Sequence, residues 1–331
     1  MSRRILILTH TGSQDALAAA QETCLQLRAG GLVPVMRRPE LEQIRRSYGE
    51  LAVPTEILDE DVNLAGVDLG MVRGGDGTIL RAAELDRGSD VPLLGVNLGH
   101  VGFLAESERA DLAQTVHWVV GREYSVEERM TIDVQVWQDK QKIAHTWALN
   151  EATVEKSDRQ RMLEVVLEVD ALPISSFGCD GVVMATPTGS TAYAFSAGGP
   201  VVWPEVQALL MVPISAHTLF AKPLVVAPTS VMALEILNRT DANGVLWCDG
   251  RRSLDLPPGS RVEVTKSEQP VRLARTRRTP FAERLVRKFE LPTTGWRGPV
   301  RESEVQVPAV PVPQVHTVEP HHIQPREEGR L

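Results

Sequence analysis

A glycine-rich loop carries the residues whose types and spacing are most suited to chemistry: residues 74–78 read Gly-Gly-Asp-Gly-Thr and follow an apolar stretch at 67–72. Glycine adopts positive φ easily, so successive backbone N–H groups can approach phosphate oxygens closely. The carboxylate of Asp76 would repel a phosphate unless it bound a metal ion or accepted the proton of an attacking hydroxyl, and both roles belong to phosphoryl transfer. A Gly-rich turn with one Asp is also compatible with a purely structural connection between a strand and a helix.

Three further segments carry groups that could bind a nucleotide. Residues 97–104 form a glycine-containing loop that leads to Phe103, whose ring could stack on a flat base or simply enter the core. Asn150 and Glu151 follow a strand-like segment, and a Glu there could accept hydrogen bonds from two ribose hydroxyls or merely end the strand. Residues 179–200 combine a strand, a turn and small hydroxyl-bearing residues, which could cap a helix and offer N–H groups to an anion.

Strands and helices are expected to alternate along the first hundred residues. Apolar runs predict strands at 5–8, 32–36, 67–72 and 91–96, and helical periodicity predicts helices at 14–29 and 79–85. This alternation predicts a parallel sheet covered by helices, with a ligand crevice at the carboxyl ends of the strands, where the Asp76 loop falls. The usual dinucleotide fingerprint is absent from the sequence, because no G-x-G-x-x-G motif opens the first helix.

From about residue 125 the pattern changes to the two-residue period of antiparallel strands. Ile132, Val134 and Val136 alternate with polar residues, and residues 138–141 predict a hairpin that leads into a strand over 142–155. Further strands are predicted at 163–169, 181–185, 224–226, 231–237, 244–248, 261–265 and 271–274, and an amphipathic helix at 280–289.

The predicted fold class is therefore α/β plus all-β: an N-terminal Rossmann-like parallel α/β domain and a C-terminal β-rich domain of the β-sandwich type. We expect the α/β domain with the glycine-rich loop at 1–118, the β-rich ligand-binding domain at 119–276, a C-terminal helix returning to the first domain at 277–300, and a disordered Pro-rich tail at 301–331.

Composition restricts the class of protein. The chain has 331 residues, of which 43% are hydrophobic and 24% charged, as is typical of a folded soluble protein. A net charge of −8 disfavours a general nucleic-acid binder, whose affinity depends on a basic surface. No apolar run reaches the length of about 18 residues that marks a membrane span, and three widely spaced cysteines fit a reducing compartment. We therefore expect a cytoplasmic protein that binds neither nucleic acid nor membrane.

The order and spacing of segments 74–78, 97–104, 150–151 and 180–200 resemble the NAD kinase family, particularly its actinobacterial members, and the likeness runs from about residue 4 to about residue 298. Gly-Gly-Asp-Gly alone is shared with 6-phosphofructokinases and the diacylglycerol kinase group, so the complete set of motifs carries the resemblance. NAD kinases transfer a phosphoryl group from ATP, or in some bacterial members from inorganic polyphosphate, to the 2′-hydroxyl of the adenosine ribose of NAD. The product is NADP.

The resemblance implies a role for each matching residue. Asp76 would accept the proton of the 2′-hydroxyl and contact NAD, beside a phosphate loop of Gly74, Gly75, Gly77 and Thr78 in which Gly77 also meets NAD. The other implied NAD contacts are Phe103 and Leu104 in the adenine region, Asn150 and Glu151 at the ribose hydroxyls, Asp180 near the nicotinamide end, Thr191, Ala192, Tyr193, Ala194, Phe195 and Ser196 along the shared pocket, and Arg81 and Arg161 as basic contacts.

The chemistry also implies partners beyond NAD. A divalent cation, Mg²⁺ carried in with ATP or another ion, is expected to neutralise phosphate charge, while the sequence assigns no metal ligands. The family resemblance further implies a homodimer or homotetramer with the β-rich domains at the interface.

Three alternatives share part of the pattern. A lipid or diacylglycerol-type kinase would need an apolar acceptor slot or a membrane-binding face, and the sequence has no basic amphipathic helix to supply one. A phosphofructokinase would need further acidic and basic residues for a sugar phosphate. A non-catalytic NAD-binding sensor would retain the pocket without turnover.

Overall fold

The computed structural model describes residues 2–9, 12, 14–51, 53–97, 102–105, 112–159, 161–239, 242–276 and 279–293. Contacts divide the chain into two units, Met1–Glu290 and Leu291–Leu331, and all the described helices and strands belong to the first. The tail expected at 301–331 lies outside the described residues, as do residues 98–101 of the loop that leads to Phe103.

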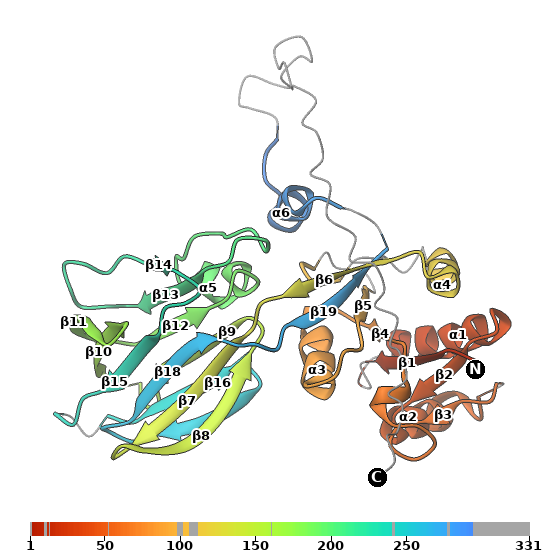
Figure 1. Ribbon diagram of the computed structural model, residues 1–331, viewed down its shortest axis with the longest axis horizontal. Helices are drawn as coiled ribbons and strands as arrows, with labels where there is room; N and C mark the ends of the chain where they lie inside the picture. Colours follow the sequence, from red (N-terminus) through yellow and green to blue (C-terminus); the bar gives the residue numbers. More distant parts are fainter. Residues whose placement is uncertain are drawn as a thin grey trace, which may run out of the picture. The chain divides into compact units, whose positions relative to one another are not determined.

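A seven-stranded sheet forms the centre of the α/β part (Figure 1). Its strands lie in the order β3 (Glu56–Ile57), β2 (Val33–Met36), β1 (Arg4–Thr9), β4 (Leu69–Arg73), β5 (Leu93–Val96), β19 (Val271–Arg275) and β6 (Ser125–Arg129). Neighbouring strands run parallel except β19 and β6, which pair antiparallel. The sheet therefore begins as a βαβ array and ends with one antiparallel edge strand.

Helices cover both faces of this sheet. Helices α1 (Gln14–Ala29), α2 (Arg38–Tyr48) and α4 (Leu112–Gly121) share one buried cluster with Ile5 and Ile7 of β1. Helix α3 (Asp76–Asp86) shares a second cluster with Leu6 and Leu8 of the same strand, near a short 3₁₀ turn, η1 (Leu64–Gly66). Burial on both faces explains why β1 reads as a continuous apolar run.

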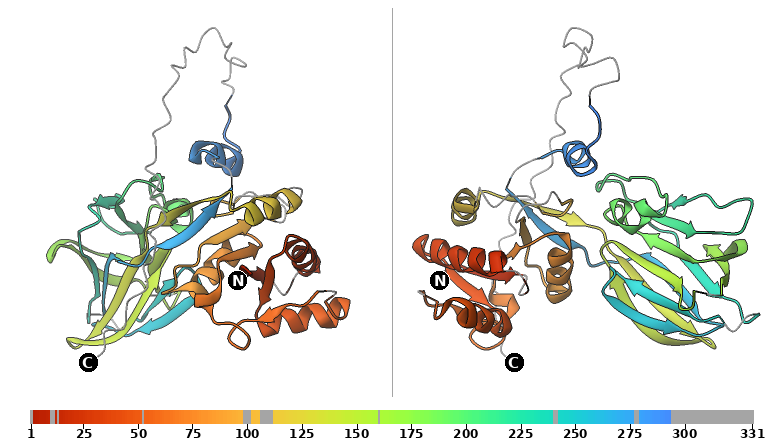
Figure 2. Two further views of the ribbon diagram at one scale, coloured as in Figure 1. Left: turned by 45° about the vertical axis from the view of Figure 1, so that its right-hand side comes forward. Right: turned by 180° about the vertical axis from the view of Figure 1, so that it is seen from behind.

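Two antiparallel six-stranded sheets form the β-rich part. One has the order β11 (Leu172–Cys179), β10 (Leu163–Val169), β15 (Met232–Ile236), β18 (Arg261–Lys266), β7 (Ile132–Gln138) and β8 (Gln141–Ala148). The other has the order β14 (Leu224–Val226), β13 (Leu209–Ile214), β12 (Gly181–Ala185), β9 (Glu151–Lys156), β16 (Gly244–Cys248) and β17 (Arg252–Leu256). Side chains from both sheets form one core cluster. The strands of the two sheets, coloured from yellow-green to light blue, can be followed in Figure 2. The arrangement is a β-sandwich.

Three short elements complete the first unit. A 3₁₀ turn, η3 (Gly189–Thr191), and a one-turn helix, α5 (Tyr193–Ser196), follow β12. Helix α6 (Phe281–Phe289) follows β19 and carries the aromatic face expected for the amphipathic helix at 280–289. No helix in the part of the chain described here is long and apolar enough to cross a membrane.

The predicted fold class is confirmed, and several elements have the predicted bounds. These are the helix at 14–29 and the strands at 163–169, 181–185, 224–226 and 244–248. Helices α2 and α4 were not predicted, nor were strands β3, β6, β11, β13 and β17.

Other elements differ from the prediction for identifiable reasons. The strand predicted over 142–155 is broken after Ala148, because Leu149 enters the α/β core while Ala148 and Ala152 enter the sandwich core. The helix predicted from residue 79 begins at Asp76, so the carboxylate belongs to the first helical turn.

The seven-stranded sheet also crosses the boundary expected between residues 118 and 119. Hydrogen bonding joins β6 and β19 to this sheet, although both ranges fall within the predicted β-rich domain. Strand pairing across more than 140 residues, such as Arg272 with Glu128, leaves no signature in local periodicity. The division into domains at 118, 276 and 300 remains a prediction.

Candidate active site

The glycine-rich loop joins β4 to α3 at the carboxyl edge of the parallel sheet. Gly74 packs so closely on the following turn that a Cβ on it would lie 2.3 Å from the Thr78 hydroxyl oxygen. Gly75 is the N-cap of α3, and no Cβ contact would arise at Gly75 or Gly77. The loop thus presents unencumbered backbone at a helix N-terminus, where N–H groups and the helix dipole favour anions.

Asp76 is held by backbone donors from a second loop. Its Oδ2 accepts a hydrogen bond from the Phe103 N–H at 3.0 Å, and its Oδ1 accepts one from the Leu104 N–H at 3.1 Å. Gly102 is required beside it, because a Cβ there would lie 2.3 Å from Asp76 Oδ1. Each carboxylate oxygen retains acceptor capacity after these bonds, so the group is oriented without being saturated.

The ring of Phe103 packs against α6 in this structure. Its centroid lies 5.6 Å from that of Phe281 and 5.8 Å from that of Phe289, and Arg284 donates to the Phe103 carbonyl at 3.0 Å. Phe289 also stacks on Phe195 of α5 at 4.4 Å. Helix α6 therefore covers two of the aromatic residues assigned to the NAD pocket.

The turn at Asn150 and Glu151 lies against the core that surrounds α3. Leu149 is fully buried and belongs to the same core cluster as Leu80 of the Asp76 helix and Leu104, so the turn shares one core with both segments. Both Asn150 and Glu151 are buried. The structure thereby brings together three of the segments that the sequence singled out.

Glu151 carries an orphaned carboxyl oxygen. Its side chain accepts from the Tyr193 backbone N–H, whereas Oε2 is buried and has no hydrogen-bond partner among the described residues. Burial, followed by the charge of Asp249, raises the pKa of Glu151 to about 8. A buried oxygen of this kind is costly unless a ligand supplies its partner.

The segment after β12 packs directly on this turn. The Thr186 hydroxyl donates to the Leu149 carbonyl at 2.6 Å, and the Thr186 N–H donates to the Asn150 carbonyl at 2.9 Å. A Cβ on Gly189 would lie 2.0 Å from the same Asn150 oxygen. The small residue at this position therefore permits the close approach.

The prediction that a hydroxyl side chain caps the helix in this segment is wrong for α5. The N-cap of α5 is Ala192, which has no capping side chain, and the Ser190 hydroxyl instead donates to the Pro187 carbonyl at 2.7 Å and accepts from the Val202 N–H at 2.9 Å. Ser190 is fully buried, so its hydroxyl satisfies the turn rather than the helix end.

The remaining pocket residues follow in η3 and α5. Tyr193 and Phe195 are partly exposed and Ala194 is fully buried, while Thr191, Ala192 and Ser196 complete the turn. Burial raises the pKa of the Tyr193 hydroxyl, with further contributions from Glu155, Glu151 and Asp180. These acidic groups therefore face the phenol.

Asp180 and Arg161 lie on the neighbouring strand ends. Lys156 approaches Asp180 Oδ1 to 2.5 Å, and this hydrogen bond lowers the pKa of Asp180. Arg161 lines a cavity of about 620 Å³ together with His217 and Arg239. Gly178, two residues before Asp180, also lines this cavity.

Arg81 is engaged elsewhere. Its guanidinium lies 3.2 Å from Glu40 on α2, and the Glu40 side chain is almost fully buried between Arg81 and Arg37. The structure thus pairs Arg81 with the α/β scaffold rather than with the turn at Asn150.

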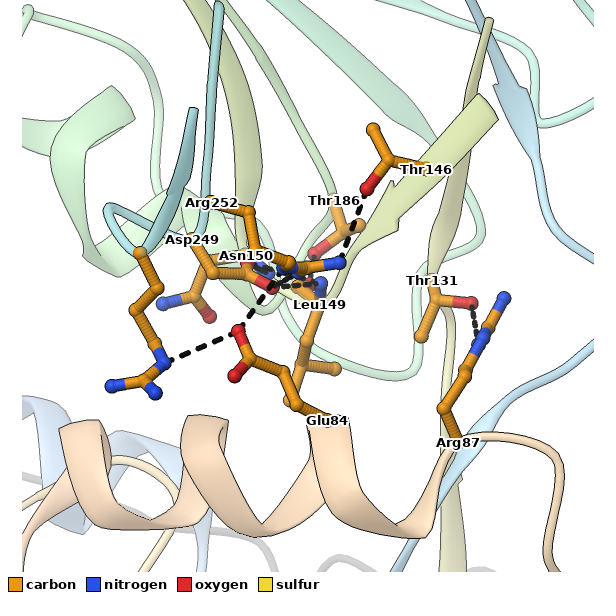
Figure 3. Close-up of polar contacts among 10 residues, drawn as sticks. Glu84, Arg87, Thr131, Thr146, Leu149, Asn150, Thr186, Asp249 and Arg252 are labelled. Carbon is orange, nitrogen blue, oxygen red and sulfur yellow. Dashed lines mark hydrogen bonds and ion pairs between the residues drawn. The ribbon is translucent and has the colours of Figure 1, made fainter. Parts of the chain in front are cut away.

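Three site-supporting residues were missed from the sequence: Glu84, Asp249 and Arg252. They connect α3 to the Asn150 turn through the polar contacts of Figure 3. The Asp-Gly pair at 249–250 did carry a signal for a tight hairpin turn, but nothing local indicates which strands that turn would reach.

The residues assembled here can orient a polar ligand and take up a proton. A carboxylate stands at a helix N-terminus, and a buried carboxyl with a vacant acceptor lies on the adjacent turn. Among the described residues no group of three or more His, Cys, Asp or Glu side chains is arranged to hold a metal ion.

Two family models match the chain, one on each side of residue 125. Residues 5–124 match the ATP-NAD kinase N-terminal domain, and residues 149–276 match the ATP-NAD kinase C-terminal domain. An NAD kinase from Leifsonia xyli is 59% identical over 297 residues, which are 90% of this chain and 97% of that protein.

Solved structures agree on the fold. A yeast NADH kinase complexed with NADH has a TM-score of 0.79 at 22% identity, and the match covers 89% of this chain and 89% of that chain. An NAD kinase from Archaeoglobus fulgidus in complex with ATP has a TM-score of 0.64 at 24% identity, with 88% of this chain and 100% of that chain covered. At these identities the likeness concerns the fold.

Proposed function

Because this chain belongs to the NAD kinase family, we propose that the residues gathered around Asp76 and the Asn150–Glu151 turn carry out the reaction of that family. The chain is an enzyme, an NAD kinase, which transfers a phosphoryl group to the 2′-hydroxyl of the adenosine ribose of NAD and forms NADP. The lipid kinase, phosphofructokinase and sensor alternatives are not favoured, since identity to an NAD kinase reaches 59% over 90% of the chain.

Asp76 is proposed as the base. A ribose hydroxyl is a poor acid, and a carboxylate within hydrogen-bond reach can orient it and take its proton as the bond to phosphorus forms, which contributes roughly 10²- to 10⁴-fold in rate. The N–H groups of Phe103 and Leu104 fix the carboxylate in one orientation. This fixed orientation supports alignment of the hydroxyl for in-line attack.

The single observation that carries the ribose assignment is the orphaned Oε2 of Glu151. This oxygen is buried on the turn beside α3 and has no partner among the described residues. A ribose hydroxyl would supply the missing donor, and the protonated form favoured by burial could also donate to the second hydroxyl. Asn150, next to it, can donate as well as accept.

The other NAD contacts are proposed on separate observations. Support for Asp180 and Tyr193 is that the charges of Asp180 and Glu151 both raise the pKa of the Tyr193 hydroxyl, after the larger effects of burial and Glu155. Arg161 is proposed as a basic contact at the cavity that it lines with His217 and Arg239. For Arg81, the pair with Glu40 favours a scaffold role over direct contact with NAD.

We propose ATP as the phosphoryl donor, with inorganic polyphosphate as the alternative. The relative from Archaeoglobus fulgidus was solved in complex with ATP, which supports the first donor. The backbone of Gly74, Gly75 and Gly77, with Thr78, would meet donor phosphates at the N-terminus of α3.

A divalent cation is proposed to reach the site on the donor phosphates. The described residues do not form an acidic cage that would hold a resident ion, and Asp76 already accepts two backbone N–H groups. Bound to phosphate, the ion would neutralise developing charge. No protein ligand is assigned to it.

Self-association as a homodimer or homotetramer in the cytoplasm is also proposed. The edge strand β11 exposes Leu172 and Ile174, which are 71% and 45% accessible. An exposed apolar edge strand of this kind favours pairing with another chain. Light scattering of the purified protein tests the assembly.

The ribose assignment is tested by Glu151→Ala, with Glu235→Ala as the control at a partly exposed strand carboxylate. We expect the KM for NAD to rise at least tenfold in Glu151→Ala, because a lost hydrogen bond to a buried group costs on the order of 1–3 kcal/mol. The KM for ATP should stay within twofold, and the control should match wild type. An unchanged KM for NAD would overturn the assignment.

A further inference from the structure

Arg252 joins three different elements through one guanidinium. Its Nε lies 3.0 Å from Glu84 of α3 and forms an ion pair with it, without a hydrogen bond at Nε among the described residues. Its Nη1 donates to the Thr146 hydroxyl of β8 at 3.2 Å, and its Nη2 donates to Asp249 at 2.9 Å. The group also lies over the Trp147 ring at 4.7 Å. A planar guanidinium suits such a fixed, multidirectional contact, which a lysine could not reproduce.

Asp249 in turn holds the ribose-side turn. Its Oδ1 accepts the Asn150 N–H at 2.7 Å, and both of its oxygens lie 3.0 Å from the Leu149 N–H. The Asp249 N–H donates back to the Glu151 carbonyl at 3.0 Å. Its side chain is 1% exposed, so these bonds form away from solvent and fix the backbone on both sides of Asn150.

Glu84 completes the connection on the other side (Figure 3). It lies eight residues after Asp76 on α3, about two helical turns along the same rigid element. A movement of Glu84 relative to Arg252 is therefore a movement of the Asp76 helix relative to the turn. Leu149 and Leu80 also belong to one apolar core cluster, but apolar packing fixes relative position less closely than directional polar contacts do.

We propose that Glu84, Arg252 and Asp249 are positioning residues that keep the Asn150–Glu151 turn aligned with the helix that begins at Asp76. This inference rests on the proposed function, in which the turn holds the ribose and Asp76 receives its proton. None of the three residues is assigned a contact with substrate. Their effect acts through the distance between base and hydroxyl, and a misalignment of about 1 Å can cost on the order of a hundredfold in rate.

The chain offers a matched control in Arg251. Its guanidinium lies 3.1 Å from the same Glu84 oxygen, and its exposure of 37% is close to the 29% of Arg252. Within the described part of the chain, Arg251 forms no ion pair with Asp249. Replacing Arg251 removes one hydrogen bond and one charge from Glu84 and leaves the pairs of Arg252 with Glu84 and Asp249 in place.

The test compares Arg252→Gln with Arg251→Gln in NADP formation and in hydrogen exchange of the peptide that contains residues 149–151. We expect Arg252→Gln to lower kcat at least tenfold, to leave the KM for ATP within twofold, and to speed exchange of this peptide at least tenfold. Arg251→Gln should match wild type within twofold in all three. Asp249→Asn serves as a second variant, because Asn tolerates the positive φ of 54° at this turn position, and the same effects are expected.

The two arms separate failure of this inference from failure of the proposed function. If wild type forms no NADP, the proposed function fails, and the exchange arm still decides whether Arg252 holds the turn. If Arg252→Gln matches Arg251→Gln in kcat and exchange, the positioning role is overturned. A lower kcat without faster exchange at 149–151 overturns it as well, because the effect would then not act through the turn.

Discussion

Replacing Glu151 with glutamine should remove a specific part of the pH dependence of stability. Burial and the charge of Asp249 raise the pKa of the Glu151 carboxyl to about 8, whereas its ordinary value is 4.5. A carboxyl whose pKa is raised in the folded state stabilises the fold at pH values below its ordinary pKa. That stabilisation is lost as pH rises towards 8.

The magnitude follows from this pKa. Each pH unit between the two values changes the free energy of unfolding by about 1.4 kcal/mol, so wild type loses about 3 kcal/mol between pH 6 and pH 9 through this group. For a folded unit of this size that corresponds to about 5 °C in Tm. Glu151→Gln has no ionisable group at this position and should lack the loss.

The assay is thermal unfolding of wild type, Glu151→Gln and the control Glu235→Gln at pH 6 and pH 9. Burial raises the pKa of Asp86 to about 7, but Asp86 titrates in all three proteins and cancels in the difference. We expect the fall in Tm between the two pH values to be smaller by about 5 °C in Glu151→Gln, and the control to follow wild type. Equal falls in all three proteins would refute the protonated, buried state of Glu151.

Three further outcomes are expected. Gly102→Ala should lower kcat at least tenfold while NAD still binds, because the new Cβ would lie 2.3 Å from Asp76 Oδ1 and displace the carboxylate. A wild-type kcat in steady-state kinetics would contradict this. Phe289→Ala should lower Tm by about 3 °C, since it removes the stacking on Phe195 and about 2 kcal/mol of aromatic packing, and an unchanged melting curve would refute it. Deleting residues 304–331, a Pro-rich segment without periodicity, should leave turnover nearly intact, and a tenfold loss would show that the segment is needed.

The sequence predicted those parts of the site that are encoded locally. The glycine-rich loop was recognisable because its residue types, its place after an apolar strand and its opening of a helix are all contained within about a dozen residues. The sandwich strands were recognisable from their two-residue period, since only one face of each sheet enters the common core.

Contacts between distant segments could not be predicted in the same way. The bond from Asn150 to Asp249 spans 99 residues, and that from Arg251 to Glu84 spans 167. Charged residues at such positions are typical of any solvated strand end or helix face. Likewise, the aromatic face of α6 predicted packing on the first domain, but not that Phe289 would also stack on Phe195.

The most direct test of the central claim is to measure NADP formation from NAD by wild type and Asp76→Asn. The assay contains Mg²⁺ and uses ATP and polyphosphate as separate donors, and NAD binding is measured on both proteins. Asparagine keeps the shape of the side chain and removes the base. We expect wild type to form NADP, and the variant to bind NAD within about threefold of wild type while turning over at least about a hundredfold more slowly. A variant that keeps more than about a tenth of the wild-type kcat would contradict the role of Asp76 as the base, and a wild type that binds NAD but forms no NADP with either donor would contradict the kinase function itself.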